Sequence, residues 1–521
     1  MPNRPFRAAL AAAAVASLAI GPAVAQDVTL TSRDGTVDIS GTLQSYDGEF
    51  YRVDTVYGPL TIDGQGVICN GIGCPDLEAF VAEFALSGSA AMGQVLLPAL
   101  VDAFARQRGL RLLREVLDES RSRFVLSDPA TGTDQARITL RLSSSEEGFA
   151  DLAAGEADLA LSLREIGPEE LSVAALAGLG DLSGPRRSLV LALDALVPVV
   201  AAANPLRALT PDELAAVFAG EVSDWSALGG AEGPISLHAP AGDSALGQLF
   251  AEEVLAPFGK TMSGQARRHA DVADLVDAVA DDPGAIGLTA WSEMGNTAPL
   301  DLRGSCGAVL AAEVATLKSE DYPLSLPLML YSPARRLPLL AREFIAFFDS
   351  SAAELVIRRA GFVDQGIDRT PLARQGARLT NAILGAGGEV PLEELQRLAR
   401  ALRGAERLST TFRFEGGSSD LDAQSRGNVA RLAQAIETGA FDGRQLVFVG
   451  FSDGEGGAMP NRAISRRRAE AVRKAVRAEA HTADFSRLKL TVDAFGEALP
   501  MACDDSAWGR RVNRRVELWL R

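Results

Sequence analysis

The first regular pattern of apolar and polar positions covers residues 28–68, where β-branched and aromatic residues alternate with polar ones. Alternation with a period of two is typical of half-buried strands. Asp34-Gly35, Asp47-Gly48 and Asp63-Gly64 interrupt it with dipeptides that hairpin turns prefer. Residues 27–75 are therefore predicted to form a small antiparallel β domain of four or five strands, to which the sequence assigns no ligand.

A second pattern covers residues 80–368, where short apolar runs alternate with amphipathic segments. Strands are expected over residues 110–117, 136–142 and 157–161, and a helix over residues 146–154. Strands that alternate with helices are typical of α/β proteins. The pattern predicts an α/β domain with a mostly parallel sheet.

The pattern changes again after residue 368. Residues 369–405 look helical, with a glycine-rich break at residues 385–388 and Pro391, and are interpreted as a connector. Residues 406–521 are predicted to form an α/β sandwich in the order β-α-β-α-β-β. Its expected elements are strand 411–414, helix 421–438, strand 446–451, helix 461–480, strand 489–495 and strand 515–520.

The N-terminus has the features of an export signal. Arg4 and Arg7 precede an unbroken run of small apolar residues over residues 8–20, and Ala23-Val24-Ala25 follows. Residues 1–25 are therefore predicted to be a secretory signal peptide, although a buried N-terminal helix is an alternative. The run is shorter than the about 20 apolar residues that span a bilayer. No later stretch is longer, so the mature chain is expected in the periplasm without a transmembrane segment.

The net charge of −17 argues against nucleic acid or an anionic membrane surface as a partner, because both would repel an acidic chain. Three scattered histidines and no paired CxxC motif offer no metal site, and no cofactor is expected.

Export would place the four cysteines in an oxidising compartment, where pairing is expected. Cys69 and Cys74 are close enough in sequence to close one tight loop. Cys306 and Cys503 remain, and they lie in different modules. A disulfide between them would join the modules covalently, and two free thiols are the alternative.

Hydroxyl residues precede several expected helices of the α/β region. Such positions can hold an anion, because free backbone N–H groups and the positive end of the helix dipole converge there. For Ser87 and Ser89, an ordinary serine N-cap is the alternative. The candidates are Ser87, Ser89, Ser144, Ser145, Ser162 and Ser244, with Arg164 as the residue that completes the site.

Residues 85–365 resemble the PstS-like phosphate-binding periplasmic proteins. The resemblance rests on six segments in order: SGSAAM, SSSEEGFADLAAGEADLALSLR, ALDALVPVVAAANPLRALTPDELAAVFAGEVSDWSALGG, DDPGAIGL, KSEDYPLSLPLMLY and AGFVDQ. It implies a two-lobed periplasmic-binding-protein (type II) fold that closes on an oxyanion, with phosphate favoured, through the seven candidates above. The chain departs from the family at Pro240, where an arginine is common, and at Ala245-Leu246, which replace glycine and threonine. These losses favour transfer of the fold over transfer of the ligand.

The segment Gly242-Asp243-Ser244 resembles a block of some serine esterases. That chemistry needs a histidine with an aspartate three residues before it. Ala266 precedes His269 at that spacing, and Ala478 precedes His481. The chain is therefore expected not to be an enzyme.

Asp453 follows an apolar strand, and Arg468 lies on the apolar face of the next expected helix. The two side chains can form a structural salt bridge or bind the opposite charges of a zwitterion. Residues 411–521 resemble the OmpA-like peptidoglycan-binding domains through residues 414–422 and the motifs LVFVGFSDGEGG, NRAISRRRAEAV, AFGEALP and GRRVNRRVELWL. The resemblance implies that Asp453 and Arg468 bind the diaminopimelate of the peptide stem, with Asn461 and Arg514 as further candidates.

The sequence thus predicts a non-enzymatic envelope protein, anchored to peptidoglycan in the periplasm, with the inner face of the outer membrane as one location. Its middle domain is expected to bind a small anion, of which phosphate is weakly favoured. Two alternatives stay open. One is a solute-binding protein that delivers its ligand to an ABC permease, and the other is a scaffold for another envelope protein that has lost its ligand.

Overall fold

The computed structural model describes residues 27–77, 79–184, 186–415, 418 and 420–521. The predicted signal peptide, residues 1–25, lies outside these residues. The chain divides into two compact units, one up to Ala82 and one from Glu83 onwards. Within the described ranges, no helix has the length and apolar character needed to cross a membrane.

The first unit is a five-stranded antiparallel sheet with the order β4-β3-β2-β1-β5. The alternation of its residues buries Val28, Leu30, Tyr51 and Val53 in a small core. This confirms the predicted antiparallel β-unit. The strands are β1 (Val28–Ser32), β2 (Asp38–Tyr46), β3 (Phe50–Thr55), β4 (Gly58–Asp63) and β5 (Val67–Asn70).

The second unit begins with a two-lobed region, residues 83–366. One long sheet crosses it in the order β14-β13-β15-β11-β19-β10-β6-β9-β8-β7. A side sheet has the order β12-β17-β18, and β16 pairs with β11. The strands are β6 (Ala82–Ser89), β7 (Arg111–Val116), β8 (Arg121–Ser127), β9 (Asp134–Ser143), β10 (Leu159–Ser162), β11 (Ser188–Val200), β12 (Ala208–Leu209), β13 (Ser236–Pro240), β14 (Arg267–His269), β15 (Ala285–Ala290), β16 (Ala298–Pro299), β17 (Asp301–Arg303), β18 (Val309–Leu310) and β19 (Ser325–Tyr331).

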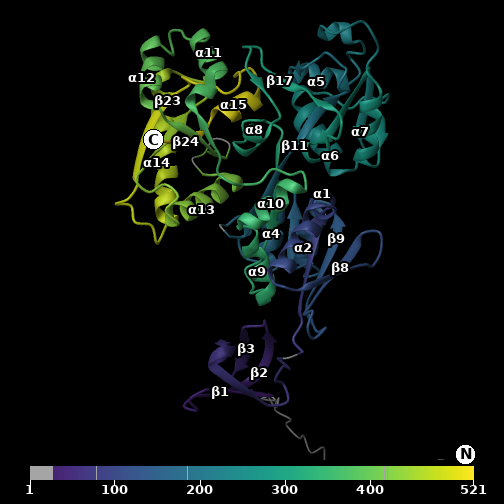
Figure 1. Ribbon diagram of the computed structural model, residues 1–521, viewed down its shortest axis with the longest axis vertical. Coiled ribbons are helices and arrows are strands. Elements are labelled where there is room, and N and C mark those ends of the chain that lie inside the picture. The colour runs from purple at the N-terminus through teal and green to yellow at the C-terminus, as the bar shows by residue number, and fades with distance from the viewer. Residues whose placement is uncertain (1–26, 78, 185, 416–417, 419) are drawn as a thin grey trace, which may run out of the picture. The chain divides into compact units, whose positions relative to one another are not determined.

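Strands β11 and β19 connect the two lobes. The last residues of β19 pair with β10 in lobe 1, which contains β6 to β10, and the first residues of β11 pair with the same end of β19. The last residues of β11 pair with β15 in lobe 2, which contains β12 to β18. Figure 1 shows β11 between the α2 and β8 group and the α5 to α7 group.

The prediction of a mostly parallel sheet is wrong, because the long sheet is mixed. Parallel pairs join β6 to β10 and β13 to both β14 and β15. Antiparallel pairs arise where short turns connect β7, β8 and β9, and where β11 and β19 cross between the lobes. The alternation of strands and helices predicted the α/β class, but the tight turns between β7 and β9 carry no helix, so they force antiparallel pairing.

Several helices of the two-lobed region begin at capping residues. Thr210, for example, forms a capping box with Glu213, and Pro211 occupies the first helical position. The helices are α1 (Ala90–Gly93), α2 (Leu96–Gln107), α3 (Ser145–Ala154), α4 (Pro168–Leu176), α5 (Pro211–Phe218), α6 (Ala245–Phe250), α7 (Val272–Asp281), α8 (Val314–Lys318), α9 (Leu339–Phe347) and α10 (Ser351–Arg359).

The C-terminal region, residues 369–521, is built on a sheet with the order β20-β21-β24-β22-β23. Strands β22 and β23 are parallel and the other pairs are antiparallel. Its elements are β20 (Arg369–Pro371), α11 (Gly376–Leu384), α12 (Leu392–Leu402), β21 (Glu406–Phe412), α13 (Ala423–Glu437), β22 (Gln445–Phe451), α14 (Ala458–Glu479), β23 (Lys489–Gly496), α15 (Ala507–Asn513) and β24 (Val516–Leu520).

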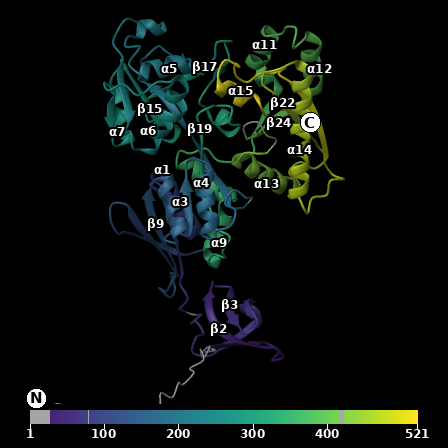
Figure 2. The ribbon, with the colours of Figure 1, turned by 180° about the vertical axis from the view of Figure 1, so that it is seen from behind.

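Helices cover both faces of this sheet, as Figures 1 and 2 show from opposite sides. Along β22, Leu446 and Phe448 face α13 and α14, whereas Val447 and Val449 face α11 and α12. A period of two therefore gives the strand two buried faces. Residues 369–405, interpreted from the sequence as a connector, form one outer layer of the sandwich.

Helix α15 is absent from the predicted order β-α-β-α-β-β. Ser506 caps it by accepting a hydrogen bond from the Gly509 backbone N–H at 3.1 Å. A Cβ atom at position 509 would lie 1.6 Å from the Cys503 carbonyl oxygen, so glycine is required there. The helix has only seven residues, which is too short for a clear apolar period.

Candidate functional site

Strand β22 delivers Asp453 into the glycine-rich loop that precedes α14. The Asp453 Oδ2 atom accepts a hydrogen bond from Arg514 Nη1 at 2.6 Å. Asn461, in the first turn of α14, donates from Nδ2 to the Asp453 carbonyl oxygen at 3.3 Å. Three of the four residues that the sequence singled out here are therefore in contact.

Arg468 lies on the inner face of α14 and is only 8% exposed. Its guanidinium lies 5.1 Å from the centre of the Phe414 ring, and its Nη2 donates to the Ser418 carbonyl at 3.5 Å. No carboxylate of the described residues pairs with it, and its Nε atom is buried without a partner among them. Burial, then the positive charge of Arg514, lowers the pKa of Arg468, while Asp453 raises it.

The structural salt bridge between Asp453 and Arg468, one of the two predicted interpretations, is absent. Asp453 pairs with Arg514 instead. The site therefore contains two guanidinium groups and one paired aspartate, so Arg468 keeps a buried charge for which no protein carboxylate is supplied among the described residues. A buried charge of this kind is costly unless a partner compensates it.

Two further acidic residues border the loop, and the sequence reasoning did not single them out. The Gly454 backbone N–H donates to Asp504 Oδ2 at 2.8 Å. Burial, followed by the charges of Glu389, Asp504 and Asp453, raises the pKa of Glu497, which directly follows β23. The sequence could have identified Glu497 as a site residue, because it follows a predicted strand within the motif AFGEALP. The site thus has an acidic side next to its two arginines.

The hydroxyl candidates of lobe 1 are mostly used within the protein. Ser87 donates to Asp151 Oδ2 at 2.5 Å, and Ser144 caps α3 by accepting from the Glu147 N–H at 3.2 Å. Ser145 accepts from the Leu163 N–H at 3.2 Å. Ser89 differs, because its hydroxyl is buried and has no partner among the described residues.

The remaining anion-site candidates also have internal partners. Ser162 donates to the Arg164 carbonyl at 2.7 Å, and Ser244 caps α6 and donates to the Ala241 carbonyl at 2.6 Å. Arg164 binds Glu170 through two hydrogen bonds of 2.9 and 2.7 Å. A bidentate pair of this kind already neutralises the guanidinium.

A cavity of about 420 Å³ lies between the lobes. Its walls carry Glu165 from lobe 1, Glu253 from lobe 2, Glu320 before β19, and Asp422 from the C-terminal region. Burial raises the pKa of Glu320 to about 8, and the charge of Asp422 adds to the effect. Arg164, Arg413 and Arg511 line the same cavity, so its walls carry charges of both signs.

Two family models match the chain. Residues 120–351 match the PBP superfamily domain, and residues 413–514 match the OmpA family. The chain therefore carries a PBP superfamily domain followed by an OmpA family domain. The OmpA match contains Asp453, Asn461, Arg468 and Arg514, whereas Ser87 and Ser89 precede the PBP superfamily match. Both families consist of binding proteins.

Similar proteins were found for each domain. Protein SphX of Synechococcus elongatus is 28% identical over 263 residues, which are 47% of this chain and 76% of that protein. An ABC-type phosphate transport receptor from Vibrio cholerae is 18% identical, over 54% of this chain and 99% of that chain, with a TM-score of 0.40. For the OmpA family domain, the peptidoglycan-associated lipoprotein from Burkholderia pseudomallei is 22% identical, over 21% of this chain and 89% of that chain, with a TM-score of 0.19.

Proposed function

We propose that the OmpA family domain binds the diaminopimelate of peptidoglycan stems and so anchors the chain to the cell wall in the periplasm. The observation that carries this proposal is the charge of Arg468, which is buried without a carboxylate partner among the described residues. A ligand carboxylate would compensate that charge and satisfy its free donor.

The acidic side of the same site suits the ligand's ammonium group. Asp453 is the acceptor in this proposal, because Arg514 bonds its Oδ2 atom and no described residue bonds its Oδ1 atom. Glu497 and Asp504 are two more acidic residues at this site. Burial raises the pKa of Glu497 most, and the nearby charges of Glu389, Asp504 and Asp453 raise it further. A zwitterion presents both charges at a fixed separation, so a paired site of this kind selects it over a simple cation or anion.

Cosedimentation with purified sacculi tests this proposal. Arg468→Gln and Asp453→Asn remove one charge each and keep the side-chain size similar, while Arg473→Gln, at an exposed position of the same helix, is the matched control. We expect the unaltered chain and the control to sediment, and both site variants to stay in the supernatant. An unaltered chain that stays in the supernatant would refute the anchor.

An oxyanion such as phosphate is a second candidate ligand, for the PBP superfamily domain. The buried, unpartnered hydroxyl of Ser89 favours it. The bidentate pairing of Arg164 with Glu170 opposes it, because an anion would have to displace a carboxylate. Calorimetric titration of the full chain with phosphate decides: heat of binding that Ser89→Ala weakens supports a receptor, and no heat favours a scaffold that has lost its ligand.

A further inference from the structure

The OmpA family domain contacts both lobes of the PBP superfamily domain. On lobe 1, the Ala423 N–H donates to Glu165 Oε1 at 2.7 Å. On the strand that links the lobes, the Val190 carbonyl of β11 accepts a hydrogen bond from Arg431 Nη2 at 2.6 Å. These contacts attach helix α13 to the lobe 1 side of the molecule.

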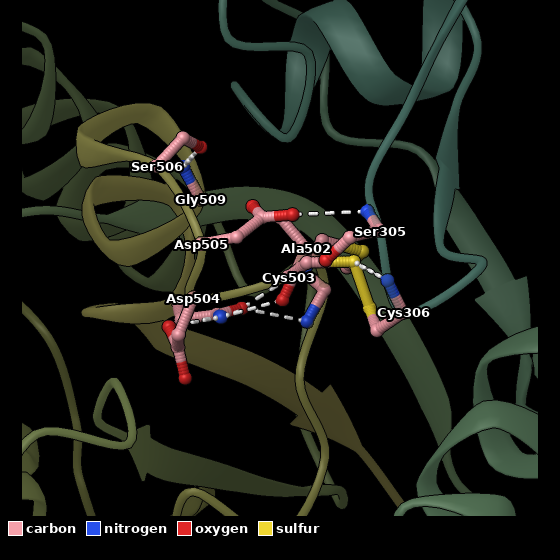
Figure 3. Close-up of a disulfide and its surroundings, with 10 residues drawn as sticks. Ser305, Cys306, Ala502, Cys503, Asp504, Asp505, Ser506 and Gly509 are labelled. Atoms are coloured by element: carbon pink, nitrogen blue, oxygen red, sulfur yellow. Dashed lines mark hydrogen bonds between the residues drawn. A yellow bond between two sulfur atoms is a disulfide. The ribbon is translucent and has the colours of Figure 1, made fainter. Parts of the chain in front are cut away.

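Helix α15 and the residues before it attach the same domain to lobe 2. Trp508 and Val512 belong to one hydrophobic cluster with Leu302 and Leu310, and each of the four is at most 8% exposed. Beside this cluster, Cys503 forms a disulfide with Cys306, as Figure 3 shows. The Ser305 N–H also donates to Asp505 Oδ2 at 2.9 Å.

A buried ionic cluster attaches the domain to the segment that leads into β19. Asp321 is 1% exposed and accepts hydrogen bonds from Arg407 Nη1 at 2.7 Å and Arg413 Nη2 at 3.1 Å. Glu320 adopts a left-handed backbone with φ of 54°, and its carbonyl accepts from Arg413 Nη2 at 2.6 Å. A non-glycine residue keeps such a conformation only where its surroundings hold it.

The consequence concerns the angle between the lobes. Two lobes that are joined by a few strands can rotate about them, and ligand-binding domains of this architecture use that rotation to open and close. Here a third body contacts lobe 1, lobe 2 and the connecting segment, so rotation would have to break buried contacts on at least one side. The same body, through Arg413, Phe414 and Asp422, also forms part of the wall of the cavity between the lobes.

We propose that the OmpA family domain is a clamp that fixes the angle between the two lobes, and that the Cys306–Cys503 disulfide is its covalent lock on lobe 2. While the lock is closed, the lobes stay at one angle and the cavity keeps its wall. Reduction of this disulfide, together with loss of the Arg413 contacts, frees the lobes to move. The proposal is independent of whether the domain binds peptidoglycan.

Single-molecule fluorescence energy transfer on the full chain tests the clamp. Dyes are attached through thioethers to Ala150→Cys on α3 and Asp277→Cys on α7, two exposed positions in lobes 1 and 2. The variants compared are Cys306→Ser with Cys503→Ser, the same pair with Arg413→Ala, and the control pair Cys69→Ser with Cys74→Ser. The control removes the disulfide of the N-terminal unit, whose two cysteines are 5 residues apart in sequence.

We expect one narrow distance distribution for the unaltered chain and for the control. The Cys306 and Cys503 pair should broaden it, and the addition of Arg413→Ala should broaden it at least twofold in width. Circular dichroism checks that each variant is folded. If the triple variant misfolds, mild reduction of the labelled unaltered chain replaces it and should also broaden the distribution. Unchanged width in the folded triple variant or in the reduced chain, or equal broadening in the control, would overturn the proposal.

Discussion

Removal of the Cys306–Cys503 disulfide should lower the free energy of unfolding of the second unit by more than removal of Cys69–Cys74 lowers that of the first. The two cysteines are 197 residues apart, whereas Cys69 and Cys74 are 5 apart. In the loop-entropy model, closing the longer loop contributes about 5 kcal/mol and closing the shorter one about 2 kcal/mol. The two disulfides also lie in different compact units, so their effects should be separable.

Differential scanning calorimetry measures both effects in one experiment. Unfolding entropies of about 2.1 cal/mol/K per residue make 5 kcal/mol worth about 5 °C in a unit of the size of residues 83–521. The smaller N-terminal unit should lose about 10 °C or more with Cys69→Ser and Cys74→Ser, because its unfolding entropy is small.

Each pair of substitutions is therefore expected to lower the transition temperature of one unit and to leave the other unchanged. Serine at positions 306 and 503 should lower only the transition of the second unit, and serine at positions 69 and 74 only that of the first. A transition of the second unit that is unchanged within about 1 °C would refute the reasoning. It would mean that the long loop is already closed in the unfolded chain or that the disulfide does not form.

Two further predictions concern buried carboxyl groups. The pKa of Glu320 is raised to about 8, so the folded chain holds a proton there that the unfolded chain releases near pH 4.5, and stability should fall as pH rises between these values. Glu320→Gln should remove this fall in stability, which is on the order of a few kcal/mol. Thermal melts from pH 4 to 9 measure it, and the same pH dependence of the melting temperature in both proteins would contradict the prediction. Burial alone would raise the pKa of Glu517, but Arg378, Arg407 and Arg515 lower it, so its stabilisation is complete above the ordinary carboxyl pKa and is lost in acid. Glu517→Gln should cost about 3 to 5 kcal/mol in urea unfolding at pH 7, because it leaves buried guanidinium groups without their partner; a loss below about 1 kcal/mol would show that the cluster is not effectively buried.

The sequence predicted the parts of the fold that depend on local pattern. A period of two over residues 28–68 identified the first sheet, since one of its faces is buried. The apolar run over residues 446–451 identified β22, which is buried on both faces. Pattern alone could not place α11 and α12, because an amphipathic helix shows which of its faces is buried and not which surface covers it. It also missed α15, whose seven residues carry the contacts of Trp508 to lobe 2.

The sequence predicted which residues belong to the candidate site, but it did not predict which of them form the ion pair. Asp453, Asn461, Arg468 and Arg514 belong to one site region, but the choice of Arg514 as the partner of Asp453 depends on how β24 approaches the loop. The anion-site candidates illustrate the opposite case. Ser144 and Ser244 act as N-caps in the structure, a role that serine commonly has at a helix start and that needs no ligand.

The most direct test of the anchor compares two peptides that differ by one carboxylate. A stem peptide that contains diaminopimelate and the same peptide with lysine in its place both carry the ammonium group, and only the first carries the carboxylate that Arg468 would bind. Calorimetric titration of the full chain should give binding to the diaminopimelate peptide and at least tenfold weaker binding to the lysine peptide, about 1.4 kcal/mol or more, with the difference abolished in Arg468→Gln. Equal affinity of the unaltered chain for both peptides would contradict the assignment of Arg468 as the carboxylate receptor.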